Sequence, residues 1–292
     1  MDRTPSKPKA ALWMAGWLSL MVVMAVAGRE ATRELNVFQI MEMRTVLGLF
    51  MLYPLIGLSG GFATLKTSRP FAHMARNLIH YVAQLGWFFA LTLIPLGQVV
   101  SLEFTMPIWT AILAASFLGE RMTIWKTFAI ALGLVGVVII VRPATGEINP
   151  GQLIALAAAV GFGTSVAMMK SLTRTEATVA IVFWMLVIQS VAGFGPSLYV
   201  WKWPSLYIWC CGIVIAFSGT FSHFCMARAM LYADATIVLP MDFLRVPLTA
   251  AAGWLIYAER LDVFTILGAA LILTGNLLNL RPSGPAPVRV GT

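Results

Sequence analysis

The sequence is short of charge. Asp, Glu, Lys and Arg make up 11% of its 292 residues, whereas hydrophobic residues make up 59%, and the mean hydropathy is +0.84. A soluble domain of this length has about a quarter of its residues charged, because its surface must stay hydrated. This chain cannot cover itself with charge, and we expect most of its surface to contact lipid.

A cysteine framework and the familiar catalytic motifs are also missing. Cys210 and Cys211 are neighbours in an apolar stretch, and Cys225 follows about four helical turns later, so these cysteines do not indicate disulfides. The sequence contains no G-x-x-x-x-G-K-[ST] loop, H-E-x-x-H helix or G-x-S-x-G elbow. ATP-driven pumping is therefore unsupported, and we expect neither an enzyme nor a cofactor.

Long apolar runs fill most of the chain. They do not alternate with a period of two, so membrane-spanning helices are expected rather than a barrel. The first run ends at Gly28 without a signal-peptide cleavage pattern, so we expect it to be a retained span. The sequence predicts an all-α integral membrane protein with ten transmembrane helices, at residues 12–28, 38–58, 74–94, 97–118, 125–141, 150–171, 178–200, 207–231, 235–257 and 263–280.

The net charge of +8 comes mostly from loops and tails, where basic residues set membrane orientation rather than nucleic-acid binding. With the N-terminus inside, the inner side receives Arg3, Lys7, Lys9, Lys66, Arg69, Arg121, Lys126, Lys170, Arg174, Arg281 and Arg289. The outer side receives only Arg29, Arg33, Arg142, Lys202 and Arg260. This excess predicts cytoplasmic N- and C-termini in a multi-pass protein of the cell inner (plasma) membrane.

A charged phrase occurs twice, as FLGERM at residues 117–122 and IYAERL at residues 256–261. Sliding the sequence by 139 positions without a gap also aligns, among other matches, Phe104 with Phe243 and Arg142 with Arg281. Apolar bias would align Leu and Ala by chance, but it would not align Glu-Arg and Arg-Pro in register. We therefore predict an internal repeat within a single transmembrane domain (1–292), with halves at 12–143 and 150–282 and a cytoplasmic tail at 283–292.

Each predicted half holds five spans. Because five is odd, the second half must enter the membrane from the opposite face, and the two halves are inverted. Inverted repeats are the architecture of many secondary transporters, which bind substrate near the bilayer midplane between the halves.

The segments FLGERMTIWKTFAIALGLVGVVII and YAERLDVFTILGAALILTGNLL resemble the signature of the EamA family in the drug/metabolite transporter superfamily. The first copy has Gly119 before Glu120 and Arg121, whereas the second has Ala258 before Glu259 and Arg260. The resemblance covers the whole chain and implies ten helices, two repeats and transport of small metabolites. Within the family, the overall likeness is to YddG-type exporters of aromatic amino acids.

The third predicted span carries a polar face. Asn77, Tyr81, Gln84 and Phe88 recur at helical spacing, with His80 beside them,. Amide, phenol and aromatic groups together suit a zwitterionic or aromatic solute. The alternative is that these groups only bond to neighbouring helices, but four polar groups near mid-span favour a substrate cavity.

Other candidate binding residues lie on three further spans. The shift of 139 places Gln84 on His223. Trp17 and Met21 belong to an aromatic and methionine stripe that would adapt to varied apolar solutes. Ser165 and Met168 lie on a small-residue face, for which close helix packing is the ordinary alternative.

The same shift places Glu103 on Asp242. Two acids at equivalent depths suggest proton coupling, but Arg245 lies three residues after Asp242 and favours an ion pair there. No basic residue lies within a helical turn of Glu103, so its coupling role stays open. Glu42 and Arg44 are two residues apart and point in different directions, and we assign neither a functional role.

Prolines at positions 107, 240 and 247 remove backbone donors and can kink the fourth and ninth spans. Taken together, the sequence predicts a secondary transporter that exports small metabolites, most of all amino acids including aromatic or apolar ones, by alternating access. A proton-coupled exporter of drugs or other metabolites is the alternative, and an integral-membrane enzyme or a channel would be a different class. We expect a monomer in the lipid bilayer, with a small-molecule substrate and no nucleic acid, metal or cofactor.

Overall fold

The computed structural model describes residues 6–117, 124–142, 149–172, 175–232 and 241–279. These residues form α-helices joined by short connections and one 3-10 helix, and they contain no strand. The helices are α1 (Lys7–Ala31), α2 (Val37–Leu58), η1 (Phe62–Leu65), α3 (Pro70–Leu93), α4 (Leu96–Glu103), α5 (Met106–Phe117), α6 (Ile124–Val141), α7 (Pro150–Leu172), α8 (Thr178–Tyr199), α9 (Leu206–Tyr232), α11 (Arg245–Tyr257) and α12 (Val263–Asn279).

These helices follow the predicted apolar segments closely, and most ends agree within four residues. The first helix begins five residues before its predicted start, because Pro8 is accepted in the first turn, where a helix needs no backbone donor. Part of the ninth segment, residues 235–240, lies outside the described residues.

Four of the described helices are long and apolar enough by themselves to cross a bilayer, at Pro8–Ala31, Val37–Leu58, Pro150–Met169 and Val179–Tyr199. Shorter apolar stretches lie at Thr127–Val141, Leu206–Ser222 and Val263–Leu278. Helix α3 is not among them, and it is the helix that carries the polar face. Its polar side chains are tolerated because much of that face is buried against other helices.

The fourth and ninth spans are both broken. The break in the fourth lies at Phe104 and Thr105, two residues before Pro107, whose ring would clash with a carbonyl in the preceding turn,. The carbonyl oxygen of Phe104 accepts a hydrogen bond from the Asn276 side-chain amide of α12 at 2.8 Å. The second break lies at residues 243–244, which are the same positions after a shift of 139.

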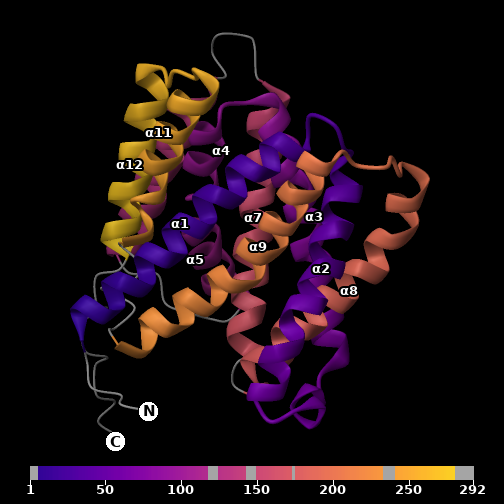
Figure 1. Cartoon of the computed structure of the whole chain (residues 1–292). Helices are drawn as coiled ribbons and strands as arrows, with labels where there is room; N and C mark the ends of the chain where they lie inside the picture. Colours follow the sequence, from indigo (N-terminus) through magenta and orange to yellow (C-terminus); the bar gives the residue numbers. More distant parts are fainter. Residues whose placement is uncertain (1–5, 118–123, 143–148, 173–174, 233–240, 280–292) are drawn as a thin grey trace, which may run out of the picture.

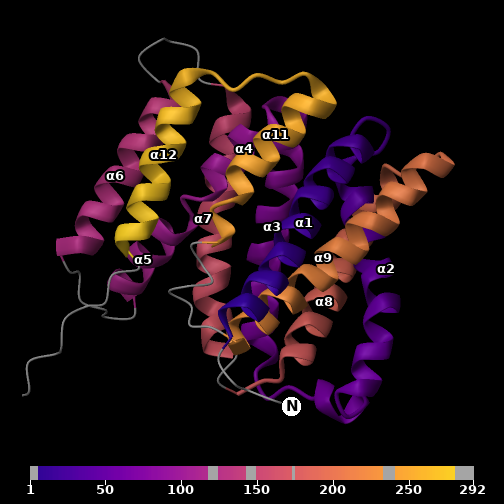
Figure 2. The same cartoon turned by 60° about the vertical axis from the view of Figure 1, so that its left-hand side comes forward.

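The helices pair in a pattern that survives exchange of the two halves. Helix α1 packs along α9, and its counterpart α7 packs along α3, which is the counterpart of α9. Helix α2 packs on its counterpart α8, and α6 packs on its counterpart α12. Figure 2 shows α6 and α12 side by side at one edge of the molecule, with α2 at the opposite edge.

The contact between α6 and α12 repeats this exchange at the level of atoms. A side chain on Gly136 would meet Gly268 and Ile272, whereas one on Gly275 would meet Ala129 and Gly133. The second set is the first shifted by 139 positions. The closest atoms are backbone carbonyl oxygens, those of Gly268 at 2.6 Å and Ala129 at 2.7 Å, so small residues here allow the close helix approach found in membrane bundles.

The second Glu-Arg phrase follows directly after α11. Glu259 lies 2.5 Å from the Arg29 guanidinium at the end of α1, and its other oxygen accepts from the Leu96 N–H at the start of α4 at 3.0 Å. The phrase therefore does more than end a helix, since Glu259 joins three helix ends. Glu120 and Arg121 lie outside the described residues.

The backbone conformation of Ala258, in the turn before Glu259, allows the effect of one substitution to be predicted. Ala258 ends α11 with φ 55° and ψ 25°, a left-handed conformation that costs a residue with a Cβ about 1 kcal/mol or more. We expect Ala258→Gly to raise the free energy of unfolding by roughly 0.5–1 kcal/mol, measured by denaturant titration in detergent. Ala251→Gly, on an exposed helical position of α11, is the matched control and should lower it by about 1 kcal/mol. Destabilisation by both substitutions would contradict the assigned turn.

Candidate functional site

The two helix breaks meet at Arg245. Its guanidinium donates to Glu103 at 2.9 Å and to Asp242 at 3.3 Å. The remaining oxygen of Glu103 accepts from the Trp87 indole at 2.8 Å, and that of Asp242 accepts from the Trp17 indole at 2.5 Å. We call these five residues the Arg245 cluster.

The two carboxylates of this cluster are fully paired. Each of its four carboxylate oxygens has a donor, and the Arg245 side chain is only 5% exposed. Arg245 also lies over the Phe104 ring, 4.8 Å from its centre. Phe104 in turn meets Phe243, its counterpart after the shift, edge to face at 5.6 Å. The cluster therefore joins the two halves at the point where each breaks a helix.

The structure gives both acids the same basic partner. Asp242 and Arg245 form the expected ion pair within one helical turn. Glu103 is not without a base, because Arg245 reaches it from the other half of the chain. Sequence separation hid this pairing, since the two residues lie 142 positions apart.

A second polar cluster lies between α2, α3 and α8. Arg44 donates to the Gln84 and Gln189 side-chain oxygens at 3.2 and 3.3 Å. One oxygen of Glu42 accepts from the Ser190 hydroxyl at 2.5 Å. Two consecutive residues of α8 therefore bond the two charged residues of α2, Gln189 to Arg44 and Ser190 to Glu42.

Helix α3 completes this second cluster. The Arg76 guanidinium donates to the Asn77 side-chain oxygen at 2.6 Å, and Asn77 lies on the same face of α3 as Tyr81, four residues later,. The Tyr81 hydroxyl and the free oxygen of Glu42 lie 2.6 and 2.8 Å from the point that a side chain on Gly193 would occupy. We call the set the α2–α3–α8 cluster, and its members are Glu42, Arg44, Arg76, Asn77, Tyr81, Gln84, Gln189 and Ser190.

Hydrogen-bonding capacity is left over in this cluster. Within the described residues, Arg76 Nε, Asn77 Nδ2, Gln189 Nε2, the Tyr81 hydroxyl and Glu42 Oε2 are buried and have no hydrogen-bond partner. Unsatisfied buried polar groups are costly and usually have an unseen partner. These groups equip the cluster to take a polar ligand.

The structure places some of the predicted binding residues in these two clusters and the others elsewhere. Asn77, Tyr81 and Gln84 come together in the α2–α3–α8 cluster, and Trp17 lies in the Arg245 cluster. Met21 packs against the neighbourhood of Trp17, the His80 ring lies 5.3 Å from the Phe162 ring, and Ser165 and Met168 lie on α7, with Ser165 fully buried. His223 lies on α9, but its side chain lies outside the described part of the structure.

Several residues of both clusters were missed by the sequence prediction. Glu42 and Arg44 were assigned no role, although a charge in an apolar span is itself a signal of function. Trp87 and Gln189 carried no such signal, because an indole or an amide in a span is ordinary. Arg76 is likewise a charge within a predicted span and was not among the predicted site residues,.

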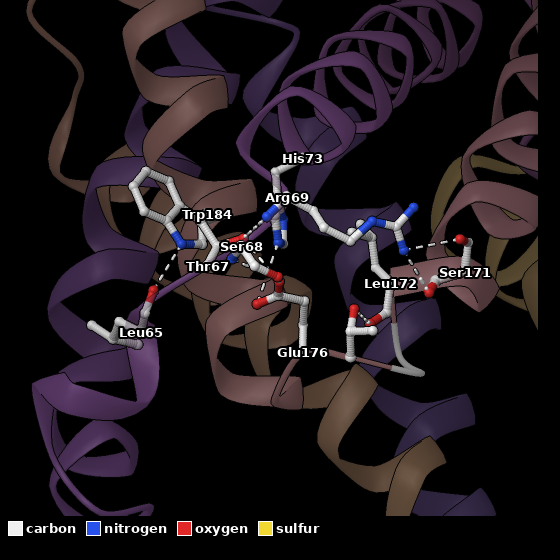
Figure 3. Close-up of polar contacts among 10 residues, drawn as sticks. Leu65, Thr67, Ser68, Arg69, His73, Ser171, Leu172, Glu176 and Trp184 are labelled. Atoms are coloured by element: carbon white, nitrogen blue, oxygen red, sulfur yellow. Dashed lines mark hydrogen bonds and ion pairs between the residues drawn. The ribbon is translucent and has the colours of Figure 1, made fainter.

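A third polar group ties the halves together at one end of the bundle (Figure 3). Glu176, which follows α7, accepts from the Thr67 hydroxyl at 3.0 Å and from the Ser68 N–H at 3.2 Å. Its other oxygen lies 4.0 Å from the His73 ring nitrogen. Figure 1 shows the connection around η1 at the opposite end of the molecule from the α11–α12 turn that carries Glu259.

The Arg245 cluster makes a direct stability prediction. Arg245→Ala would leave two buried carboxylates without their shared cation, so we expect the free energy of unfolding in detergent to fall by about 3–5 kcal/mol. Adding Glu103→Gln to this variant removes one of the two charges and should restore part of the loss. Wild-type stability of Arg245→Ala would show that the cluster does not hold the halves together.

Comparison with known proteins identifies the family. The model of the EamA-like transporter family matches the chain twice, at residues 8–142 and 149–281. A crystal structure with 18% sequence identity aligns with a TM-score of 0.65 over 94% of this chain and 97% of that chain, which shows a shared fold.

Relatives with named activities also cover most of the chain. The S-adenosylmethionine uptake transporter of Rickettsia bellii is 28% identical over 90% of this chain and 91% of that protein. The riboflavin transporter of Brucella anthropi is 31% identical over 81% of this chain and 85% of that protein. The pseudopaline exporter CntI of Pseudomonas aeruginosa is 26% identical over 86% of this chain and 88% of that protein. Because the family model matches nearly the whole sequence, the chain belongs to the EamA-like transporter family and is a multi-pass membrane transporter of small molecules.

Proposed function

We propose that the chain is a secondary transporter of the cell inner membrane that moves a small organic metabolite by alternating access between two inverted halves. The observation that carries this proposal is the Arg245 cluster, which joins the halves where both break a helix. Discontinuous helices at the interface between inverted repeats are typical of secondary transporters, in which the substrate binds between the repeats.

Inversion of the halves is supported by their packing. The reciprocal contacts of Gly136 and Gly275 are those of two units related by a two-fold axis. With five predicted spans in each half, that axis lies in the membrane plane and both termini lie in the cytoplasm.

Alternating access requires the two ends of the bundle to open in turn, and at each end one polar contact joins the halves. Glu176 joins the halves at one end through Thr67 and Ser68, and Glu259 joins them at the other through Arg29. Each contact is a few hydrogen bonds and ion pairs, which a carrier can break and remake at modest cost.

The relatives bear on the substrate. They are named for S-adenosylmethionine, riboflavin and pseudopaline, so the narrower expectation of aromatic amino acids gains no support from them. Amino-acid-related metabolites stay the predicted substrates, and S-adenosylmethionine falls in that class. Export also stays a prediction, since one of these relatives is named for uptake and one for export.

Transport by the purified chain is the test of this function. In liposomes we expect saturable counterflow of at least one of labelled S-adenosylmethionine, riboflavin and phenylalanine, because a carrier with a finite number of sites must saturate. Protein-free liposomes are the control. Flux that rises linearly with concentration would instead indicate a channel, and exchange of no solute would contradict transport.

A pH gradient imposed on the same vesicles decides coupling. A facilitated carrier only equilibrates its solute, whereas the proton-coupled alternative would accumulate it against its own gradient. Glu103 is fully paired, so we expect Glu103→Gln to leave any such accumulation in place. Loss of accumulation in that variant would restore the coupling role that the sequence left open for Glu103.

A further inference from the structure

The α2–α3–α8 cluster holds two buried positive charges without a matching acid. Arg44 and Arg76 are 3% and 4% exposed. In the described part of the chain, Arg44 bonds only to amide oxygens, and Arg76 bonds to Asn77 and to the Met169 sulfur. Among the described residues, none of the ion pairs includes either of them. An uncompensated charge at membrane depth is expensive and usually marks a ligand pathway.

The unsatisfied atoms around these guanidinium groups are donors. Arg76 Nε, Asn77 Nδ2 and Gln189 Nε2 are buried and lack an acceptor in the described chain. Guanidinium groups with neighbouring amide donors match the planar oxygens of a carboxylate, which accepts several hydrogen bonds at once. This side of the cluster is therefore suited to an organic anion.

The other side of the cluster is suited to a cation. Glu42 has one oxygen bonded to Ser190, while Oε2 is buried and lacks a donor in the described chain. The Tyr81 hydroxyl borders the same point next to Gly193 and is also without a partner among the described residues. A carboxylate and a phenol oxygen together can accept from an ammonium group.

The two sides are adjacent. On α8, Gln189 contacts Arg44 while the next residue, Ser190, contacts Glu42. On α3, Gln84 contacts Arg44, and Tyr81 lies one turn before it, about 4.5 Å along the axis,. Gln84 and Tyr81 thus place the anion-binding side and the cation-binding side one helical turn apart along α3, a spacing that fits a ligand whose opposite charges are separated by a single carbon.

We infer that the α2–α3–α8 cluster binds the zwitterionic head of an α-amino acid. The carboxylate is held by Arg44 and Arg76, and the ammonium by Glu42 and Tyr81. This inference rests on the proposed transport function and deepens it, because it requires a free carboxylate and a free amine on the substrate. S-Adenosylmethionine and simple amino acids meet that requirement, whereas riboflavin does not.

Pairs of ligands that differ in one charged group test the inference. Half-saturation concentrations are measured for S-adenosylmethionine against decarboxylated S-adenosylmethionine, and for phenylalanine against phenethylamine and N-acetylphenylalanine. Each analogue lacks one charge-assisted contact, so the wild type should bind it at least about tenfold more weakly.

Variants assign each preference to its residues. Arg44→Gln and Arg76→Gln should reduce the preference for the carboxylate toward onefold and keep the preference for the free amine. Glu42→Gln should do the reverse. Arg33→Gln is the matched control, because its side chain is 63% exposed at the end of the bundle, and it should keep both preferences.

Two glycine substitutions test the site by steric hindrance, without changing any charge. Gly193→Ala intrudes between Tyr81 and Glu42, whereas Gly195→Ala on the same helix meets nothing within 4 Å. We expect only the former to lose the preference for the free amine. Where a charge variant fails to fold, Arg44→Lys and the wild-type ligand pairs still give a result.

Each failure has a distinct meaning. Saturable transport of riboflavin with no competition from α-amino acids would overturn the inference and leave the proposed function standing. Equal binding of amine and amino acid by the wild type, or unchanged preferences in Arg44→Gln and Arg76→Gln, would also overturn the inference alone. Saturable transport of no solute would overturn both.

Discussion

The shared guanidinium of Arg245 is the interaction on which the arrangement of the two halves depends. It bonds one carboxylate from each half, Glu103 and Asp242, at the positions where both halves interrupt a helix. Backbone at membrane depth is tolerated in a non-helical form only where other groups satisfy it, and Asn276 does so at the first break. The breaks, the acids and Phe104 with Phe243 all coincide after one shift of the sequence, so the symmetry of the chain and its polar centre have a common origin.

The two polar clusters differ in how many of their buried polar atoms have partners, which suggests a structural role for one and a binding role for the other. In the Arg245 cluster every carboxylate oxygen has a donor, and such a network stabilises one packing of the halves. In the α2–α3–α8 cluster, buried donors and one buried acceptor lack partners in the described chain. Paired carboxylates favour one packing of the halves, whereas unpaired buried groups would gain free energy from a polar substrate.

Sequence alone predicted the apolar helices and the polar residues of α3 that the structure brings together, because both depend on local pattern along the chain. It failed where the partner lies on another helix. The pairing of Glu103 with Arg245 joins residues 142 positions apart, and the contact of Glu42 with Ser190 joins residues 148 apart. The spacing of Glu42 and Arg44 correctly showed that they do not pair with each other, but it gave no information on what each of them meets on α3 and α8.

Alternating opening of the two ends is the central claim, and a pair of distances measures it. With Cys210, Cys211 and Cys225 replaced, spin labels at the exposed positions Lys66 and Thr175 report the end closed by Glu176, and labels at Arg33 and Arg260 report the end closed by Glu259. Pulsed electron paramagnetic resonance in liposomes should show that a transported solute lengthens one distance and shortens the other. Distances that both stay fixed, or that change in the same direction, would contradict alternating access about the Arg245 cluster.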